Sequence, residues 1–287
     1  QKFAEGKIGR DELLDSEARS YHSPGTCTFY GTANSNQMMM EIMGLHLPGS
    51  SFVNPYTPLR DQFTAKAASQ ILKFRASGDD FRPIGHVVDE KAIVNAIVGL
   101  LATGGSTNHT MHLVAIARMA GIIINWNDFD NLSKIIPLIA RVYPNGPADV
   151  NDFQNAGGLQ AVISQLLSHG LLHEEILTVG DQKGLGQYEF DVQLESDELV
   201  YSKVPTASRN TDIISAVDTP FAPIGGIHLM RGNLGRGISK VSAVSEEHHV
   251  VEAPAMVFDD QEEMLAAFRK GELERDFVAV IRFQGPR

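Results

Sequence analysis

Apolar residues at helical spacing dominate the first 180 residues of the chain. The run 37–43, which follows a loop with the single cysteine, and the almost wholly apolar run 90–101 predict two buried helices. Asp89 precedes the second run and suits an N-cap, whereas Thr32 or Asn34 suits the start of the first. This part of the chain is therefore expected to be mainly helical.

Strand-like sequence becomes common only after residue 205. Strands are expected over 122–126 and, later, over 227–230, 238–242, 250–258 and 277–283. A charged stretch, 181–204, separates the helical part from the strand-rich part. We therefore predict a mixed α/β protein, with part of a mainly helical first domain over 1–180, a linker or variable insertion over 181–204, and the start of a β-rich second domain over 205–287.

The composition limits the class of protein. Hydrophobic residues make up 43% of the 287 residues, enough for a sizeable core. The net charge of −11 disfavours binding to nucleic acid or to an anionic membrane surface, although a locally basic site could take an anionic small substrate. No apolar run is long enough to predict a membrane span. One cysteine excludes an internal disulfide framework and is typical of a reducing compartment, so we expect a cytoplasmic protein.

The single cysteine, Cys27, lies between two glycines and among several hydroxyl side chains. Glycine lets the backbone approach a bound group closely, which suits a functional thiol. Two other interpretations stay open on the residues alone. A free cysteine is often a small buried hydrophobe. A nucleophilic cysteine would need a base, which His22, His109 or His112 could provide.

A second motif, Gly-Gly-Ser-Thr-Asn-His at 104–109, opens an apolar helix expected over 107–120. Free N–H groups and the positive end of the helix dipole would favour an anion there. An ordinary glycine turn with a hydroxyl cap explains the same residues equally well. His109 and His112 are spaced for one helix face, but no acidic or cysteine partner accompanies them as metal ligands would require. The chain contains no P-loop, G-x-G-x-x-G or G-x-S-x-G motif.

Several long motifs resemble one known family. The cysteine loop Gly-Thr-Cys-Thr-Phe-Tyr-Gly-Thr-Ala-Asn-Ser-Asn (25–36), together with the motif at 104–109, is similar to the dihydroxy-acid/6-phosphogluconate dehydratase family. The resemblance covers the chain except for about 181–204, and it implies a cluster-binding first domain and a barrel-like second domain that is present only in part. Further stretches that agree with the family are 43–55, 88–95, 142–149, 170–174, 232–236 and 251–255.

Two features favour the phosphogluconate-acting branch of this family. Its dihydroxy-acid branch has a loop that resembles Gly-Ala-Cys-Gly-Gly-Met-Tyr-Thr-Ala-Asn, and usually has Ala after Gly-Gly-Ser-Thr-Asn. Here the loop is Gly-Thr-Cys-Thr-Phe-Tyr-Gly-Thr-Ala-Asn, and the residue after the second motif is His109. The resemblance implies a hydro-lyase that dehydrates 6-phospho-D-gluconate to 2-dehydro-3-deoxy-6-phosphogluconate, as in the Entner–Doudoroff pathway of carbohydrate metabolism.

The resemblance also implies the composition of the site. Cys27 would be one ligand of a [4Fe–4S] cluster, of which one iron acts as a Lewis acid on the C3 hydroxyl. The full-length protein would also hold a divalent metal such as Mg²⁺. The base that removes the C2 proton, a serine, is expected downstream of this chain. Substrate contacts are expected from Ser106, Asn108, His109, Arg282 and Gln284.

We expect this sequence to be a piece of a longer protein, because one cysteine cannot hold a cluster and the last predicted strand has no element after it. The piece alone is expected to be inactive and free of metal. The full-length protein is expected to bind a small anionic sugar acid and to form a homodimer. Two alternatives remain: a sister dehydratase that acts on another sugar acid or a dihydroxy acid, and a folded module without catalytic activity.

Overall fold

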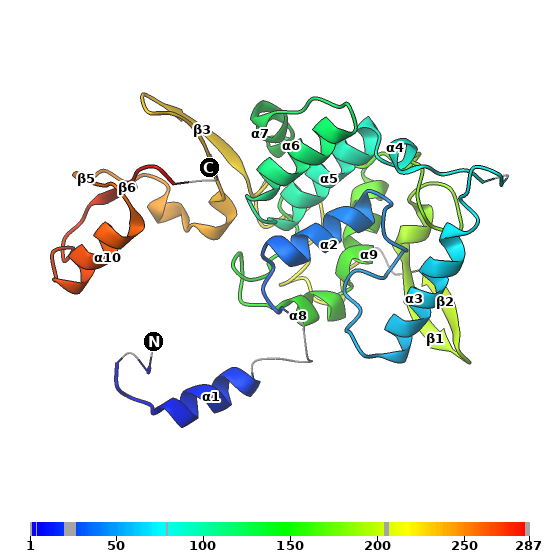
Figure 1. Ribbon diagram of the computed structural model, residues 1–287, viewed down its shortest axis with the longest axis horizontal. Helices are drawn as coiled ribbons and strands as arrows, with labels where there is room; N and C mark the ends of the chain where they lie inside the picture. The colour runs from blue at the N-terminus through cyan, green and yellow to red at the C-terminus, as the bar shows by residue number, and fades with distance from the viewer. Residues whose placement is uncertain (1, 4, 20–26, 79, 204–206, 285–287) are drawn as a thin grey trace. The chain divides into compact units, whose positions relative to one another are not determined.

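A computed structural model of the protein describes residues 1–287 except 1, 4, 20–26, 79, 204–206 and 285–287 (Figure 1). Backbone contacts divide the chain into two compact units, Gln1–Ala243 and Val244–Arg287, which are described separately. Helices come first along the chain and short strands follow, so the predicted mixed α/β class is confirmed. The division into two domains with a linker at 181–204 stays a prediction.

Two packed helices form the centre of the first unit. α2 (Thr32–Ile42) and α5 (Glu90–Thr103) contact each other extensively, and α9 (Gly158–Ser168) is buried along most of its length (Figure 1). Gly99 permits close approach of α5 and α2, since a Cβ added there would lie 2.8 Å from Met38 Sδ. The other helices of this unit are α1 (Arg10–Arg19), α3 (Pro58–Ile71), α4 (Ile84–Val87), α6 (His109–Met119), α7 (Trp126–Ser133) and α8 (Val150–Asn155).

The ends of α5 follow the sequence closely. The Asp89 carboxylate accepts a hydrogen bond from the Ala92 amide at 2.8 Å, so the predicted cap is confirmed. At the other end, Gly104 takes a left-handed conformation with φ of 59°, which glycine adopts without a side-chain clash. The helix is therefore delimited at both ends by local sequence, and its apolar interior fixes it in the core.

The described strands form three separate pairs. In the first unit, β1 (Phe190–Glu195) and β2 (Glu198–Lys203) form an antiparallel hairpin, as do β3 (His228–Gly232) and β4 (Gly235–Ser239). In the second unit, β5 (Ala255–Phe258) and β6 (Val278–Ile281) pair in parallel around α10 (Gln261–Arg269). None of these pairs closes into a barrel among the described residues, so the barrel-like feature expected for the second domain is not seen there.

The strand predicted over 122–126 is wrong. Residues 122–125 run without strand pairing, and Trp126 begins α7. The reason is local: Asn125 and Asp128 form a capping box, in which each side chain bonds the backbone of the other. This capping fixes a helix start at the point where the apolar run alone indicates a strand. Among the residues that the structure describes, no helix combines the length and the apolar composition needed to cross a lipid bilayer.

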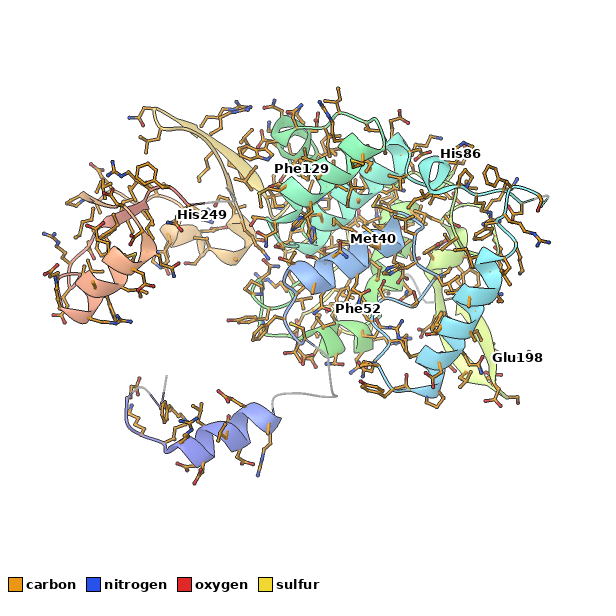
Figure 2. All side chains as sticks on the ribbon, in the orientation of Figure 1. Met40, Phe52, His86, Phe129, Glu198 and His249 are labelled. Carbon is orange, nitrogen blue, oxygen red and sulfur yellow. The ribbon has the colours of Figure 1, made fainter. Side chains whose placement is uncertain are left out.

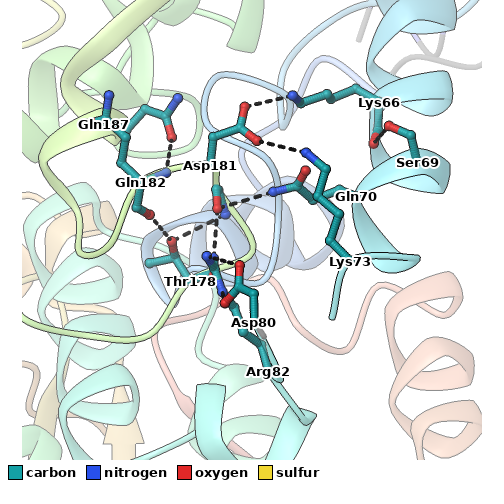
Figure 3. A network of polar contacts seen from close by, with 11 residues as sticks. Lys66, Ser69, Gln70, Lys73, Asp80, Arg82, Thr178, Asp181, Gln182 and Gln187 are labelled. Atoms are coloured by element: carbon teal, nitrogen blue, oxygen red, sulfur yellow. Dashed lines mark hydrogen bonds and ion pairs between the residues drawn. The ribbon is translucent and has the colours of Figure 1, made fainter. Parts of the chain in front are cut away.

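A nearly buried arginine joins distant segments of the first unit (Figure 3). Arg82 pairs in a bidentate manner with Asp80, at 2.7 Å for each of the two bonds. Its remaining nitrogen donates to the carbonyl oxygens of Thr178 and Gly180, the latter at 2.7 Å. The guanidinium also lies 4.6 Å from the centre of the Phe74 ring. This arginine therefore ties the segment after α3 to the segment before β1.

We predict that Arg82→Met lowers the free energy of unfolding by about 2–4 kcal/mol, because it leaves two carbonyl groups without their charged donor. The matched change Lys73→Met removes an exposed ion pair to Asp181 at 3.8 Å and is expected to cost less than about 1 kcal/mol. Urea denaturation of both variants measures the difference. Equal effects of the two substitutions would contradict the role given to Arg82.

Candidate functional site

Cys27 lies just before α2, in a segment that Asn34 holds in place. The Asn34 amide nitrogen donates to the carbonyl oxygens of Cys27 at 2.8 Å and of Phe29 at 2.6 Å. The thiol is exposed, and its Sγ lies 3.9 Å from the Phe29 carbonyl oxygen. The interpretation of Cys27 as an ordinary buried thiol is therefore wrong. Its backbone is held by Asn34 while its sulfur stays accessible, which is compatible with a metal ligand.

The start of α2 differs from the cap that the sequence suggests. Gly31 occupies the cap position and provides no side-chain hydrogen bond, whereas Thr32 is the first helical residue. Asn34 lies within the first turn, where its amide reaches back to the cysteine segment. The polar side chains at this helix start thus bind neighbouring segments instead of capping their own helix.

The second motif, 104–109, docks on this same helix start. Thr32 Oγ1 lies 2.9 Å from Ser106 Oγ and accepts a hydrogen bond from the Asn108 amide at 2.8 Å. Ser35 Oγ lies 2.9 Å from His109 Nε2 and accepts from the Ser106 backbone N–H at 3.2 Å. The structure therefore brings together two motifs that are more than 70 residues apart in sequence.

His109 is fully buried in this contact. Burial lowers the pKa of its imidazole to about 4, so the ring is neutral near pH 7. Its Nδ1 is buried and has no hydrogen-bond partner among the described residues. Of the other predicted substrate contacts in this unit, Ser106 is half-buried and Asn108 is exposed. His109 itself presents no surface to a ligand in this arrangement.

The remaining predicted contacts, Arg282 and Gln284, belong to the second unit. The Arg282 guanidinium pairs with Asp259, and the Gln284 amide donates to the Arg282 carbonyl at 3.2 Å. Their role in substrate binding stays a prediction. His22, one of the bases considered for Cys27, lies outside the described residues.

The described residues contain no group of three or more His, Cys, Asp or Glu side chains that could hold a metal ion. Cys27 fits one ligand position of an iron–sulfur cluster, because its thiol is exposed and a thiolate is the usual ligand. The described residues do not complete such a site by themselves. His109 and His112, whose spacing suits one helix face, have no third ligand among the described residues either, and the centres of their two rings lie 5.7 Å apart.

Cys27 also lines a polar pocket of about 290 Å³ that the sequence does not indicate. The pocket lies between the cysteine segment, the loop before α3, and the start of α8; Phe52 of that loop is labelled in Figure 2. The stretch 43–55, which resembles the family, contributes residues 51–55 to this lining, but the likeness does not indicate that they lie next to Cys27. Its polar lining, apart from Cys27, comprises Asn34, Gln37, Ser51, Asn54, Arg60 and Asn151.

Comparison with known proteins identifies the family. The family model "Dihydroxy-acid/6-phosphogluconate dehydratase N-terminal" matches residues 1–187, and its C-terminal counterpart matches 212–287. The chain therefore belongs to the dihydroxy-acid/6-phosphogluconate dehydratase family. The family is named for dehydratases, which are hydro-lyases.

Named relatives agree with this assignment. Proteins named phosphogluconate dehydratase from Rhizobium meliloti and Pseudomonas aeruginosa are each 58% identical over 100% of this chain and 47% of their own length. A protein named dihydroxy-acid dehydratase from Ignicoccus hospitalis is 35% identical over 98% of this chain and 48% of its own length. The chain thus spans about half the length of the relatives it matches.

We predict that His109 makes stability depend on pH. Its folded pKa of about 4 lies below the value of 6.5 expected in the unfolded chain, so the unfolded state binds more protons between these values. The free energy of unfolding should therefore fall, by up to about 3 kcal/mol from this group, as the pH falls from 6.5 towards 4. In His109→Gln, this part of the pH dependence should be absent in denaturation curves.

The matched control is His112→Gln, which removes an exposed histidine from the same helix. It should keep the pH dependence of the unsubstituted protein. If the curves of His109→Gln and His112→Gln run parallel across this range, burial does not keep His109 neutral.

Proposed function

We propose that the whole protein dehydrates 6-phospho-D-gluconate to 2-dehydro-3-deoxy-6-phosphogluconate. The observation that carries this proposal is 58% identity over the full chain to proteins named phosphogluconate dehydratase, against 35% to a protein named dihydroxy-acid dehydratase. The difference favours a sugar-acid substrate over a branched dihydroxy acid. The presence of Thr-Phe-Tyr after Cys27 and of His109 after Asn108 supports the same branch.

In this proposal, the reaction removes a proton from C2 and hydroxide from C3, and the resulting enol becomes the 2-keto acid. A [4Fe–4S] cluster, when bound, would supply the Lewis acid that assists departure of the hydroxyl group. Cys27 is the residue of this chain that would hold iron. We assign the base to none of the described residues, and we propose Mg²⁺ as a further metal of the whole protein on the family resemblance.

The residues around Cys27 would support this chemistry by fixing the backbone that carries its sulfur. Asn34 binds the backbone on both sides of Thr28 through the Cys27 and Phe29 carbonyl groups, so this backbone cannot reorient without breaking two hydrogen bonds. Such hydrogen bonds around a ligand orient it and tune the metal. The polar pocket next to Cys27 would then admit the substrate from the side of the exposed thiol.

The proposal predicts substrate preference in the whole protein, purified with its cluster intact. Turnover is measured on 6-phosphogluconate, gluconate and 2,3-dihydroxyisovalerate. We expect kcat/KM to be at least about 100-fold higher for 6-phosphogluconate than for the other two, since a site that binds a charged group rejects analogues that lack it. A preference for gluconate or for the dihydroxy acid would instead support a sister dehydratase. Absence of turnover on all three would support a non-catalytic module.

A further inference from the structure

The pocket beside Cys27 contains more hydrogen-bonding groups than the protein itself uses. The side-chain amides of Gln37, Asn54 and Asn151 line it, and none of them makes a hydrogen bond within the described part of the chain. The Asn151 amide nitrogen is buried as well as unpaired. A buried donor without a partner is costly and needs an explanation, of which a bound ligand is one.

The pocket also carries positive charge without a counter-ion in its lining. Arg60 donates through one nitrogen to the carbonyl oxygens of Ser50 and Val53, which fixes the plane of the guanidinium. Its other nitrogens make no hydrogen bond to described residues. No Asp or Glu side chain is among the lining residues that the structure describes. Within a chain of net charge −11, this pocket is therefore a local site for an anion.

Glu41 lies outside this lining, although its carboxyl group interacts electrostatically with Arg60. Glu41 is fully buried behind the loop, and it accepts hydrogen bonds from the Gly49 and Ser51 amides at 2.7 and 2.9 Å and from Gln160 at 2.9 Å. Burial raises the pKa of Glu41, which favours its neutral form. Glu41 thus supports the loop that forms the pocket wall, and among the described residues it makes no hydrogen bond to Arg60.

We propose that this pocket binds the carboxylate end of the sugar acid, with Arg60 on the carboxylate and with Asn151 and Gln37 on the carboxylate or the adjoining hydroxyls. The inference rests on the proposed function. In that reaction the proton and the hydroxyl group leave from C2 and C3, which adjoin the carboxylate, so this end belongs beside the thiol that holds iron. A pocket of about 290 Å³ lies just below the usual range of roughly 300–1,000 Å³ for sites of whole small ligands, so it suits one end of the sugar acid. In this arrangement, the phosphate at C6 lies outside the pocket.

The test uses Asn151→Asp in the whole protein. This change keeps the size of the side chain and removes no described hydrogen bond, but it puts an anion where the proposal places the substrate carboxylate. We expect KM for 6-phosphogluconate to rise roughly tenfold to a hundredfold, with a smaller change in kcat. Gln37→Glu, at another lining residue, should act in the same direction.

The matched control is Asn155→Asp. Asn155 lies on the same short helix and is exposed, and the described pocket lining does not include it. The same charge change there should leave KM within about twofold of the unsubstituted value. Thermal unfolding of all three variants checks that the fold is retained. Unchanged KM in both Asn151→Asp and Gln37→Glu would overturn the pocket assignment, while turnover by the unsubstituted protein would leave the proposed function in place.

Binding to the cluster-free whole protein separates the two ends of the substrate. Calorimetry compares 6-phosphogluconate, gluconate and glucose 6-phosphate, of which the last has the phosphate without the carboxylate. Asn151→Asp should weaken binding of the two acids roughly tenfold or more and leave glucose 6-phosphate unaffected. Weaker binding of glucose 6-phosphate alone would show that the pocket binds the phosphate, and would overturn the proposal. The unsubstituted protein could turn over none of the three tested compounds while Asn151→Asp still weakens gluconate binding. In that case the proposed function fails, but the assignment of the pocket to the carboxylate is supported.

Discussion

The start of α2 is hydrogen-bonded both to the segment that leads into α6 and to the segment that carries Cys27. Thr32 and Ser35 of α2 contact Ser106, Asn108 and His109, while Asn34 of the same turn binds the cysteine segment. One helix start therefore holds two motifs at once. The other end of α2 buries Met38, Met39 and Ile42, and the helix packs on α5, so the polar contacts cannot shift without disturbing the core.

This arrangement places polar groups in the interior at some energetic cost. His109 and Glu41 are both fully buried, and burial favours the neutral form of each. Each serves as a fixed hydrogen-bonding group: His109 for the start of α2, and Glu41 for the loop at 49–51. The start of α2 and the loop at 49–51 both contribute residues to the Cys27 pocket, and both depend on these buried polar groups. Arg60 and the unpaired amides are part of the pocket lining itself.

Much of the fold follows from local sequence. Apolar spacing predicts α2 and α5, and Asp89 caps the latter as its position suggests. The strand expected over 122–126 is wrong because the capping box of Asn125 and Asp128 outweighs the β-branched run. The likeness to the family points correctly to the two motifs that the structure brings together.

The pocket beside Cys27, in contrast, was beyond prediction from the sequence. Asn34, Arg60 and Asn151 come from three separate segments, and neither spacing nor residue type indicates that their side chains converge. The burial of His109 is not predicted by the sequence either. Its position after the Gly-Gly-Ser-Thr-Asn run suggests a ligand contact, whereas its ring is buried in the structure.

The central claim is that Cys27 holds iron at the place where the sugar acid reacts. Its most direct test is the iron and sulfide content of the whole protein after Cys27→Ser, with Asn36→Ala, an exposed change on α2, as the matched control. The account predicts that Cys27→Ser loses most of its cluster and its dehydratase activity, while Asn36→Ala keeps both. Full iron content and turnover in Cys27→Ser would contradict it.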